Sequence, residues 1–425
     1  MSEIINEKST SNTPTSAVEA PSVEVPSYLP RQTIGQLLRN ELGFFPVLMT
    51  LIIIMAVFGF ASPFFLTPRN LSNLLLQIAT IGVDALGVTL VLLLGEIDLS
   101  VASVGTLGAV VMGILSARGI TLPGGAHYFF PAWAAITIGI LTGTLVGFIN
   151  GLFRAVLQLP SFIVTLAAFI AYEGLLLYLL AGQSTLIIND SAINNIAGSP
   201  TSYLPWYLGI GLPTVIALVY IVLVVLDQLN RRRAGLRTKP LWQLLVQIGL
   251  VIVIVGGAVL LFENYLGVPN STAILIGLIL IFWLILTKTR YGRHIYAVGG
   301  NSEAARRAGI NVTGIRVAAF TLCSTLAVVG GILAASRETA VASQVDPLLL
   351  LESIGAAVIG GVSLFGGRGS VWSIILGALI IGSLINGLAL LNQTQAVEEM
   401  IEGAVLLLAV TADALVRRAQ ARSGR

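Results

Sequence analysis

The chain has 425 residues, of which 56% are hydrophobic and only 10% are charged. Soluble globular domains carry roughly 25% charged residues, so this composition excludes an ordinary soluble protein and indicates an integral membrane protein. A net charge of +3 could suggest nucleic-acid binding, but the basic residues lie at the ends of apolar segments, which is the pattern of membrane topology. We therefore expect a lipid bilayer and no nucleic acid as partner, and the single cysteine, Cys323, excludes an internal disulfide framework.

Residues 1–35 are rich in Ser, Thr, Pro and Glu and contain few large apolar side chains. Such a segment cannot bury enough apolar surface to offset its chain entropy, which predicts a disordered cytoplasmic tail. Arg31 and Arg39 then precede an apolar run from Phe44. This N-terminus lacks the short apolar core and the cleavage site of a signal peptide, so we expect the first span to be a retained anchor.

Twelve apolar segments follow, which predicts an all-α polytopic membrane protein in residues 36–425. One or two of these segments could be re-entrant, and 351–365 is the best example because it is short and interrupted by glycine. The segments are 44–61, 71–94, 99–117, 132–153, 160–181, 205–226, 241–262, 269–287, 317–336, 351–365, 371–391 and 399–416.

The distribution of Lys and Arg tests a strict alternation of crossings that begins inside the cell. Only Arg69, Arg118 and Arg337 of the 23 basic residues fall in outside loops, which leaves 20 in the inside loops and tails. Because Lys and Arg are retained on the cytoplasmic side of a membrane, this split predicts that both termini are cytoplasmic.

A loop rich in acidic and small residues precedes the segment 99–117. Asp98 is placed to cap the following helix, whereas Glu96 has no such role and is the better functional candidate. Carboxylates in or near a bilayer are costly and usually functional, so those within spans should face the interior of the bundle or water. These are Asp84, Glu173 and Glu402.

Residues 288–316 form a basic, glycine-punctuated loop with six Lys or Arg and one Glu. The loop contains a short helix near 302–308 whose N-cap is Asn301 or Ser302 and whose C-cap is Gly309. Glu303 lies in the positive first turn, and Arg306 and Arg307 lie in the negative last turn. A short surface helix between two spans can be pushed by another protein, although an ordinary basic loop would show the same charge.

Two segments with similar sequences indicate an internal repeat. Residues 100–113 and 370–382 share Ser-Val-x-Ser and Leu-Gly-Ala-x-x-x-Gly once one gap is allowed, and glycine-rich residues precede the second copy, with Ser370 as its expected N-cap. Both copies would run from inside to outside, so the repeat is parallel, as in many transporter folds. Chance similarity between helices of small residues is the alternative, because such residues are common at membrane packing interfaces.

Four motifs occur in order along the chain: Gly95–Val101, Gly292–Asn301, Glu303–Val312 and Val358–Leu364. In these motifs the chain resembles the permease subunits of monosaccharide ABC importers, in the ribose/xylose branch of binding-protein-dependent permeases. Within that branch the chain is most similar to D-xylose permeases. Ribose-type members often have Gly where Glu96 stands and lack the apolar pair 205–262 with its basic hinge at 231–233, while Ala102 replaces a frequent Gly.

The resemblance implies the ABC importer permease fold, with a permease domain over 36–425 and a cytoplasmic coupling loop over 288–316. The permease would lie in the plasma (cell inner) membrane and pair with a second permease subunit, as a homodimer or with a non-identical copy. An extracytoplasmic sugar-binding protein would deliver the monosaccharide, and a separate ATPase subunit would drive transport. The implied ATPase-coupling residues, with the three alanines facing the ATPase, are Gly300, Asn301, Ser302, Glu303, Ala304, Ala305, Arg306, Arg307, Ala308 and Gly309.

The lining of the translocation pathway is less certain from sequence, because polar residues within spans can also form hydrogen bonds between helices. The candidates are Glu96, Asp98, Asn150, Glu173 and Asn386. Asn73, Gln77 and Tyr172 are polar positions of the same kind. The sequence does not decide which sugar passes.

Two other classes of function remain. A secondary transporter with twelve spans would normally divide at its middle, whereas this repeat pairs the third segment with the eleventh. An enzyme needs a nucleophile, metal ligands or an acid–base pair, and two histidines and one cysteine form no such cluster. The chain also lacks a G-x-x-x-x-G-K-[ST] loop, so we expect no ATPase site, no cofactor and no metal in this subunit.

Overall fold

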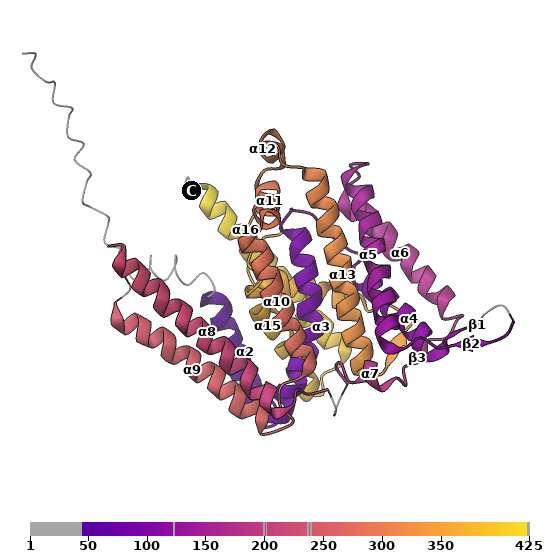
Figure 1. Ribbon diagram of the computed structural model, residues 1–425, viewed down its shortest axis with the longest axis horizontal. Coiled ribbons are helices and arrows are strands. Elements are labelled where there is room, and N and C mark those ends of the chain that lie inside the picture. The colour runs from indigo at the N-terminus through magenta and orange to yellow at the C-terminus, as the bar shows by residue number, and fades with distance from the viewer. Residues whose placement is uncertain are drawn as a thin grey trace, which may run out of the picture. The chain divides into compact units, whose positions relative to one another are not determined.

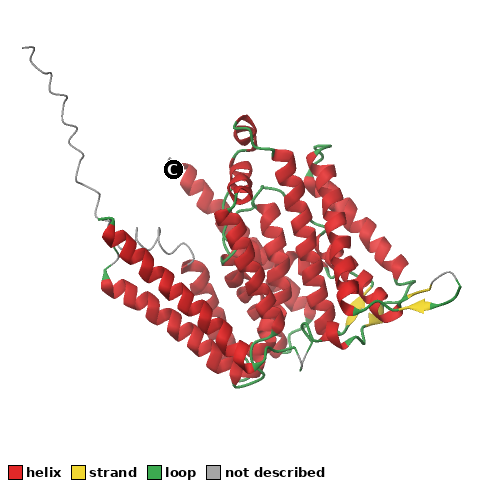
Figure 2. Cartoon of the chain, in the orientation of Figure 1, coloured by secondary structure: helices red, strands yellow, loops and turns green. Residues whose placement is uncertain are grey.

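The computed structural model describes residues 45–121, 124–198, 200, 202–235, 238 and 240–422, so the predicted tail over 1–35 lies outside the described residues. The described chain is mostly helical (Figure 2), which confirms the all-α class. The larger helices are α2 (Phe45–Ala61), α3 (Pro68–Leu92), α4 (Val101–Gly113), α5 (Ala132–Ala155), α6 (Ser161–Leu179), α8 (Trp206–Arg233), α9 (Leu241–Glu263), α10 (Asn270–Lys288), α11 (Arg290–Gly300), α13 (Val312–Glu338), α14 (Pro347–Ile359), α15 (Ser373–Leu390) and α16 (Gln395–Arg422). The shorter elements are η1 (Ile114–Arg118), α7 (Ser191–Asn194), α12 (Ser302–Arg307), β1 (Ile120–Thr121), β2 (His127–Tyr128), β3 (Thr185–Ile187) and β4 (Ala340–Ala342).

Nine helices in the described ranges are long and apolar enough to cross a membrane, so the predicted count of about twelve is not confirmed. The nine are α3, α4 continued by η1, α5, α6, α8, α9, α10, α13 and α15. Two shorter apolar helices, Val47–Ala61 and Pro347–Ile359, match the predicted segments 44–61 and 351–365. Thirteen residues of α14 extend only about 20 Å, so this helix alone is shorter than a bilayer core.

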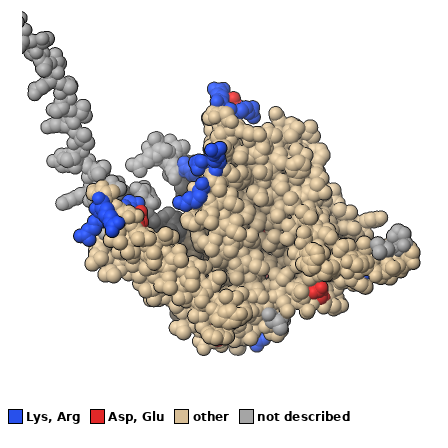
Figure 3. All heavy atoms as spheres, viewed as in Figure 1, with Lys and Arg blue, Asp and Glu red and all other residues tan. Residues whose placement is uncertain are grey.

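The helical bundle has two distinct ends (Figure 1). One end carries α11, α12 and the C-terminal end of α16 (Figure 1). We call it the basic end, because Lys and Arg gather around α11 and α12 in the space-filling view (Figure 3). The other carries α7 and the strands, and we call it the hairpin end. Arg69, Arg118 and Arg337 lie at the helix termini of the hairpin end, as the alternation of crossings predicts.

Glycines allow the helices to pack closely at the centre of the bundle, where α13 contacts α3, α4 and α5. On α5, Gly139, Gly143, Gly147 and Gly151 recur every four residues and form one stripe against α13 and α4. A Cβ atom added at Gly151 would lie 2.9 Å from the Cα atom of Val317, so only glycine permits this separation. Close approach through small residues is a common way for helices to associate in membranes.

Two irregular segments, 93–100 and 360–372, meet near the basic end. The Gly367 N–H donates to the Leu93 carbonyl oxygen over 2.9 Å, and a Cβ added at Gly366 would lie 2.7 Å from the Gly95 nitrogen. Gly95, Gly366 and Gly367 all have positive φ, a conformation that glycine adopts without steric cost. The chain after α14 therefore continues to the basic end as loop rather than helix, and the structure joins the two loops that precede the predicted repeat.

Three local expectations were wrong in detail. Asp98 and Ser370 are not the residues at the N-caps: α4 begins after Ser100 and α15 after Trp372, and neither cap makes a side-chain hydrogen bond. The loop 288–316 contains two helices rather than one, because α11 precedes α12. The strands β3 and β4 pair across regions expected to be loops, which the local sequence could not reveal because the partners are far apart in the chain.

Candidate functional site

The short helix α12 stands at the basic end with both termini capped, as predicted. Asn301 Oδ1 accepts hydrogen bonds from the backbone N–H groups of Glu303 (3.1 Å) and Ala304 (2.9 Å). At the C-terminus, Ile310 N–H donates to the Ala305 carbonyl and Gly309 N–H to the Arg306 carbonyl, each over 3.0 Å, with Gly309 at φ +82°. This is the Schellman arrangement, so hydrogen bonds define both ends of the six-residue helix.

The exposed face of α12 consists of charged side chains and small side chains. Glu303 pairs with Arg307 over 3.3 Å on the surface, and Ala304 and Ala308 are exposed. Ala305, expected to face a partner, is instead 5% exposed and belongs to the core of this chain. Ala305 therefore anchors α12 to its own bundle and leaves Ala304 and Ala308 as the apolar positions open to a partner.

Helix α11 links α12 to the two irregular segments. The Tyr296 hydroxyl donates to the Gly369 carbonyl over 2.8 Å, and a Cβ added at Gly299 would meet the Gly367 nitrogen at 2.7 Å. Burial raises the pKa of the Tyr296 hydroxyl, and it raises that of the more deeply buried Tyr291 far above the usual range. The Leu93 carbonyl oxygen also lies against Gly299, so α11 packs closely on both irregular segments.

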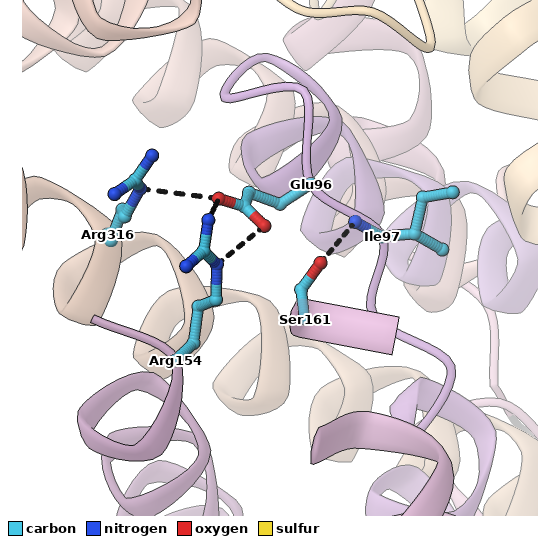
Figure 4. A network of polar contacts seen from close by, with 5 residues as sticks. All are labelled: Glu96, Ile97, Arg154, Ser161 and Arg316. Atoms are coloured by element: carbon cyan, nitrogen blue, oxygen red, sulfur yellow. Dashed lines mark hydrogen bonds and ion pairs between the residues drawn. The ribbon is translucent and has the colours of Figure 1, made fainter. Parts of the chain in front are cut away.

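A buried ion cluster lies beside these loops (Figure 4). Arg154 Nε donates to Glu96 Oε2 over 2.8 Å, and Arg154 Nη2 donates to Oε1 over 2.5 Å. Arg316, at the start of α13, forms an ion pair with the same carboxylate over 3.3 Å. Ser161 Oγ accepts from the Ile97 N–H over 3.4 Å, so α5, α6 and α13 all hold the segment 93–100.

The other residues predicted to line the pathway lie in different parts of the bundle. Asp98 Oδ1 accepts from the Ser100 N–H and hydroxyl, and Asn150 donates to the Ser100 hydroxyl over 3.2 Å. Asn386 accepts from the Asn70 amide over 2.7 Å. Both asparagines thus join helices, as the alternative interpretation of these residues held, and Glu173 is half-buried on α6.

A cavity of about 350 Å³ lies among α3, α4, α13, α14, α15 and β4. Its rim contains exposed Glu338, Gln344 and Asp346, and its wall reaches buried Asp84 in the middle of α3. Binding pockets for small molecules have volumes of about 300–1,000 Å³, so the space suits one small ligand. Glu352 on α14 lines the same cavity.

None of the five predicted pathway residues is part of the described lining of this cavity, and their role in transport remains a prediction. Sequence reasoning missed Arg154 and Arg316 as the partners of Glu96, because helix contacts set that pairing. Asp84 had been noted as a carboxylate within a span, and the same rule would have identified Glu352. In the part of the chain that the structure describes, no group of three or more His, Cys, Asp or Glu residues could hold a metal ion.

Comparisons with known proteins agree with this architecture. Residues 70–410 match the family model described as "Branched-chain amino acid transport system / permease component". The chain is 34% identical over 372 residues to the "Xylose transport system permease protein XylH" of Haemophilus influenzae, covering 86% of this chain and 95% of that protein.

Ribose permeases also match. The "Ribose import permease protein RbsC" of Escherichia coli is 30% identical over 367 residues, covering 86% of this chain and 92% of that protein, and that of Bacillus subtilis is 31% identical over 374 residues, covering 88% and 92%. A comparison with solved structures finds no significant match. The extent of the family match shows that this chain belongs to the family of membrane permease components that bears the description above.

Proposed function

We propose that the chain is the permease subunit of an ABC-type importer that moves a monosaccharide, D-xylose or a related pentose, across the plasma membrane. Support for the sugar comes from the relatives, since identity is 34% to a xylose permease and 30–31% to ribose permeases. The observation that carries the proposal is α12, a doubly capped helix with an exposed outer face that connects through α11 to both irregular segments.

In this proposal the basic end and both termini are cytoplasmic, in agreement with the retention of Lys and Arg on that side. A separate ATPase subunit binds α12 and its flanks, Gly300 to Gly309, and supplies the energy. A sugar-binding protein delivers the monosaccharide at the hairpin end, and a second permease subunit, in a homodimer, completes the complex. The exposed arginines and Glu303 would orient the ATPase, and Ala304 and Ala308 would allow close approach.

Uptake of radiolabelled D-xylose, D-ribose and L-leucine by cells that carry the complete importer tests the proposal. We expect uptake of a pentose, no uptake of leucine, and loss of uptake when the phosphate-binding lysine of the ATPase subunit is replaced. Uptake that survives loss of the ATPase but stops when an uncoupler dissipates the proton gradient would favour a secondary transporter instead. Transport of leucine without pentose would overturn the choice of substrate.

A further inference from the structure

The carboxylates that line the cavity among α3, α4 and α14 become more buried from its rim to its inner end. Glu338 and Asp346 at the rim are exposed, Glu352 is half-buried, and Asp84 is 2% exposed. Past Asp84 toward the basic end, the rest of α3 up to Leu92 is buried. The cavity is therefore entered from the hairpin end and ends at a carboxylate in the middle of the bundle.

Small residues create this space. Gly105 and Ala109 on α4 and Gly331 and Ala335 on α13 line the cavity. Where these helices touch, a Cβ added at Gly105 would lie 2.7 Å from the Ala327 carbonyl oxygen. The two backbones thus approach closely beside the cavity, while their short side chains leave room for a ligand within it.

Asp84 is the most deeply buried carboxylate of the cavity. Its Oδ1 is buried and accepts no hydrogen bond from any described residue. A buried acceptor without a donor is costly, and a buried carboxylate more so. The oxygens of an aspartate side chain accept hydrogen bonds whether the group is ionised or protonated, so a ligand with O–H or N–H groups would supply the partner that Oδ1 lacks.

The other residues that line the cavity limit the chemical class of the ligand. Four carboxylates (Asp84, Glu338, Asp346 and Glu352) face one guanidinium, that of Arg337, and Gln77, Thr80 and Thr106 add neutral hydrogen-bonding groups. The exposed Glu338 and Asp346 at the rim outnumber Arg337, which disfavours sugar phosphates and sugar acids, and the buried acceptors suit neutral molecules that carry several hydroxyl groups. Among the described lining residues none is aromatic, so the site lacks a stacking surface for tight binding.

We propose that Asp84 and Glu352 form a transit subsite that accepts hydrogen bonds from the hydroxyl groups of the monosaccharide as it passes through the permease. This inference rests on the proposed function and assigns the subsite within it. A transit site must bind well enough to admit the sugar and weakly enough to release it, which agrees with acceptors on a wall of small side chains.

Initial-rate uptake of D-xylose and of its 2-deoxy, 3-deoxy and 4-deoxy analogues, measured with the complete importer in cells, tests the subsite. Asp84→Asn keeps the shape of the side chain but replaces one of its two oxygen atoms with an amide NH₂ group, and we expect Vmax/KM for D-xylose to fall roughly ten- to hundredfold. At least one deoxy analogue should be taken up by wild type and variant with similar Vmax/KM, because it lacks the hydroxyl group that donates a hydrogen bond to Asp84. Asp227→Asn, which changes an exposed carboxylate on α8 outside this cavity, should leave uptake unchanged.

Membrane levels and co-purification of the ATPase establish that each variant is folded, and Glu352→Gln provides the same analogue comparison if Asp84→Asn fails to insert. Equal fractional losses for D-xylose and every analogue would show that the carboxylates are structural and would overturn the subsite. Unchanged uptake by both variants beside an active wild type would overturn the subsite but not the proposed function. A wild-type importer that takes up none of these sugars would overturn both.

Discussion

Arg154 and Glu96 form a two-point ion pair across 58 residues of sequence, with Nε and Nη2 donating to the two carboxylate oxygens over 2.8 and 2.5 Å. Arg316 lies 3.3 Å from the same carboxylate, and the Glu96 side chain is only 7% exposed. Among the residues that the structure describes, this carboxylate is the one acidic group paired with the two guanidinium groups. It keeps the end of α5 and the start of α13 together against the segment 93–100.

Glu96→Gln should destabilise the protein, because it leaves the positive charges of Arg154 and Arg316 close together without the negative charge that lies between them. Removal of one partner from a buried ion pair costs about 3 kcal/mol. Glu303→Gln is the matched control, since Glu303 also pairs with two arginines but is 59% exposed, and its loss should cost less than about 1 kcal/mol. Thermal unfolding in detergent measures both, and equal shifts in Tm would mean that burial of the cluster contributes nothing.

Gly147→Ala should lower the stability of the bundle. The added Cβ would lie 2.6 Å from the Phe320 carbonyl oxygen, so α5 and α13 must move apart, at a cost of about 1–3 kcal/mol. Gly174→Ala on α6 is the control, because nothing lies within 4 Å of its Cβ position and alanine favours a helix by about 1 kcal/mol. Membrane level and Tm are the measurements, and a stable Gly147→Ala protein would contradict the packing described.

Tyr296→Phe should weaken the link between α11 and the segment 360–372. The lost hydrogen bond to the Gly369 carbonyl is worth about 1 kcal/mol. We expect a clear loss of sugar uptake with only a small decrease in Tm. Tyr291→Phe on the same helix should be neutral or stabilising, since the buried Tyr291 hydroxyl accepts and donates no hydrogen bond within the described residues. If both variants lowered uptake equally, the hydroxyl of Tyr296 would have no special part in coupling.

Single cysteines should report the orientation of the two ends. Ser302→Cys at the basic end should react with an impermeant maleimide only in inside-out vesicles, and Ala126→Cys in the β1–β2 connection only in intact cells. The native Cys323 is fully buried and should stay unlabelled, so wild type is the background. Labelling of both cysteines from the same side would reject the topology.

Ala304→Glu and Ala308→Glu should reduce association with the ATPase subunit, because each adds a charge to the small exposed face of α12 without touching the core. Ala234→Glu adds the same charge at the exposed end of α8 and should leave association unchanged. Co-purification at matched membrane levels is the measurement. Normal association of both α12 variants would show that the ATPase binds elsewhere.

Features that depend on neighbouring residues follow from the sequence alone. Apolar length and the placement of Lys and Arg identified a polytopic membrane protein and its two ends, because transfer to a bilayer depends on each segment alone. The ends of α12 were also predictable. Asn301 and Gly309 act through hydrogen bonds to residues at most four positions away.

Residues that are far apart in the sequence come into contact only through the packing of the helices. The pairing of Glu96 with Arg154 and Arg316, and the cavity between Asp84 and Glu352, depend on the separation and rotation of whole helices. Glycines on α4, α5 and α13 set that separation through contacts between backbones. Hydrophobic periodicity shows which residues are apolar but not which helix lies opposite, so these sites follow from the packed fold and not from the pattern of the chain.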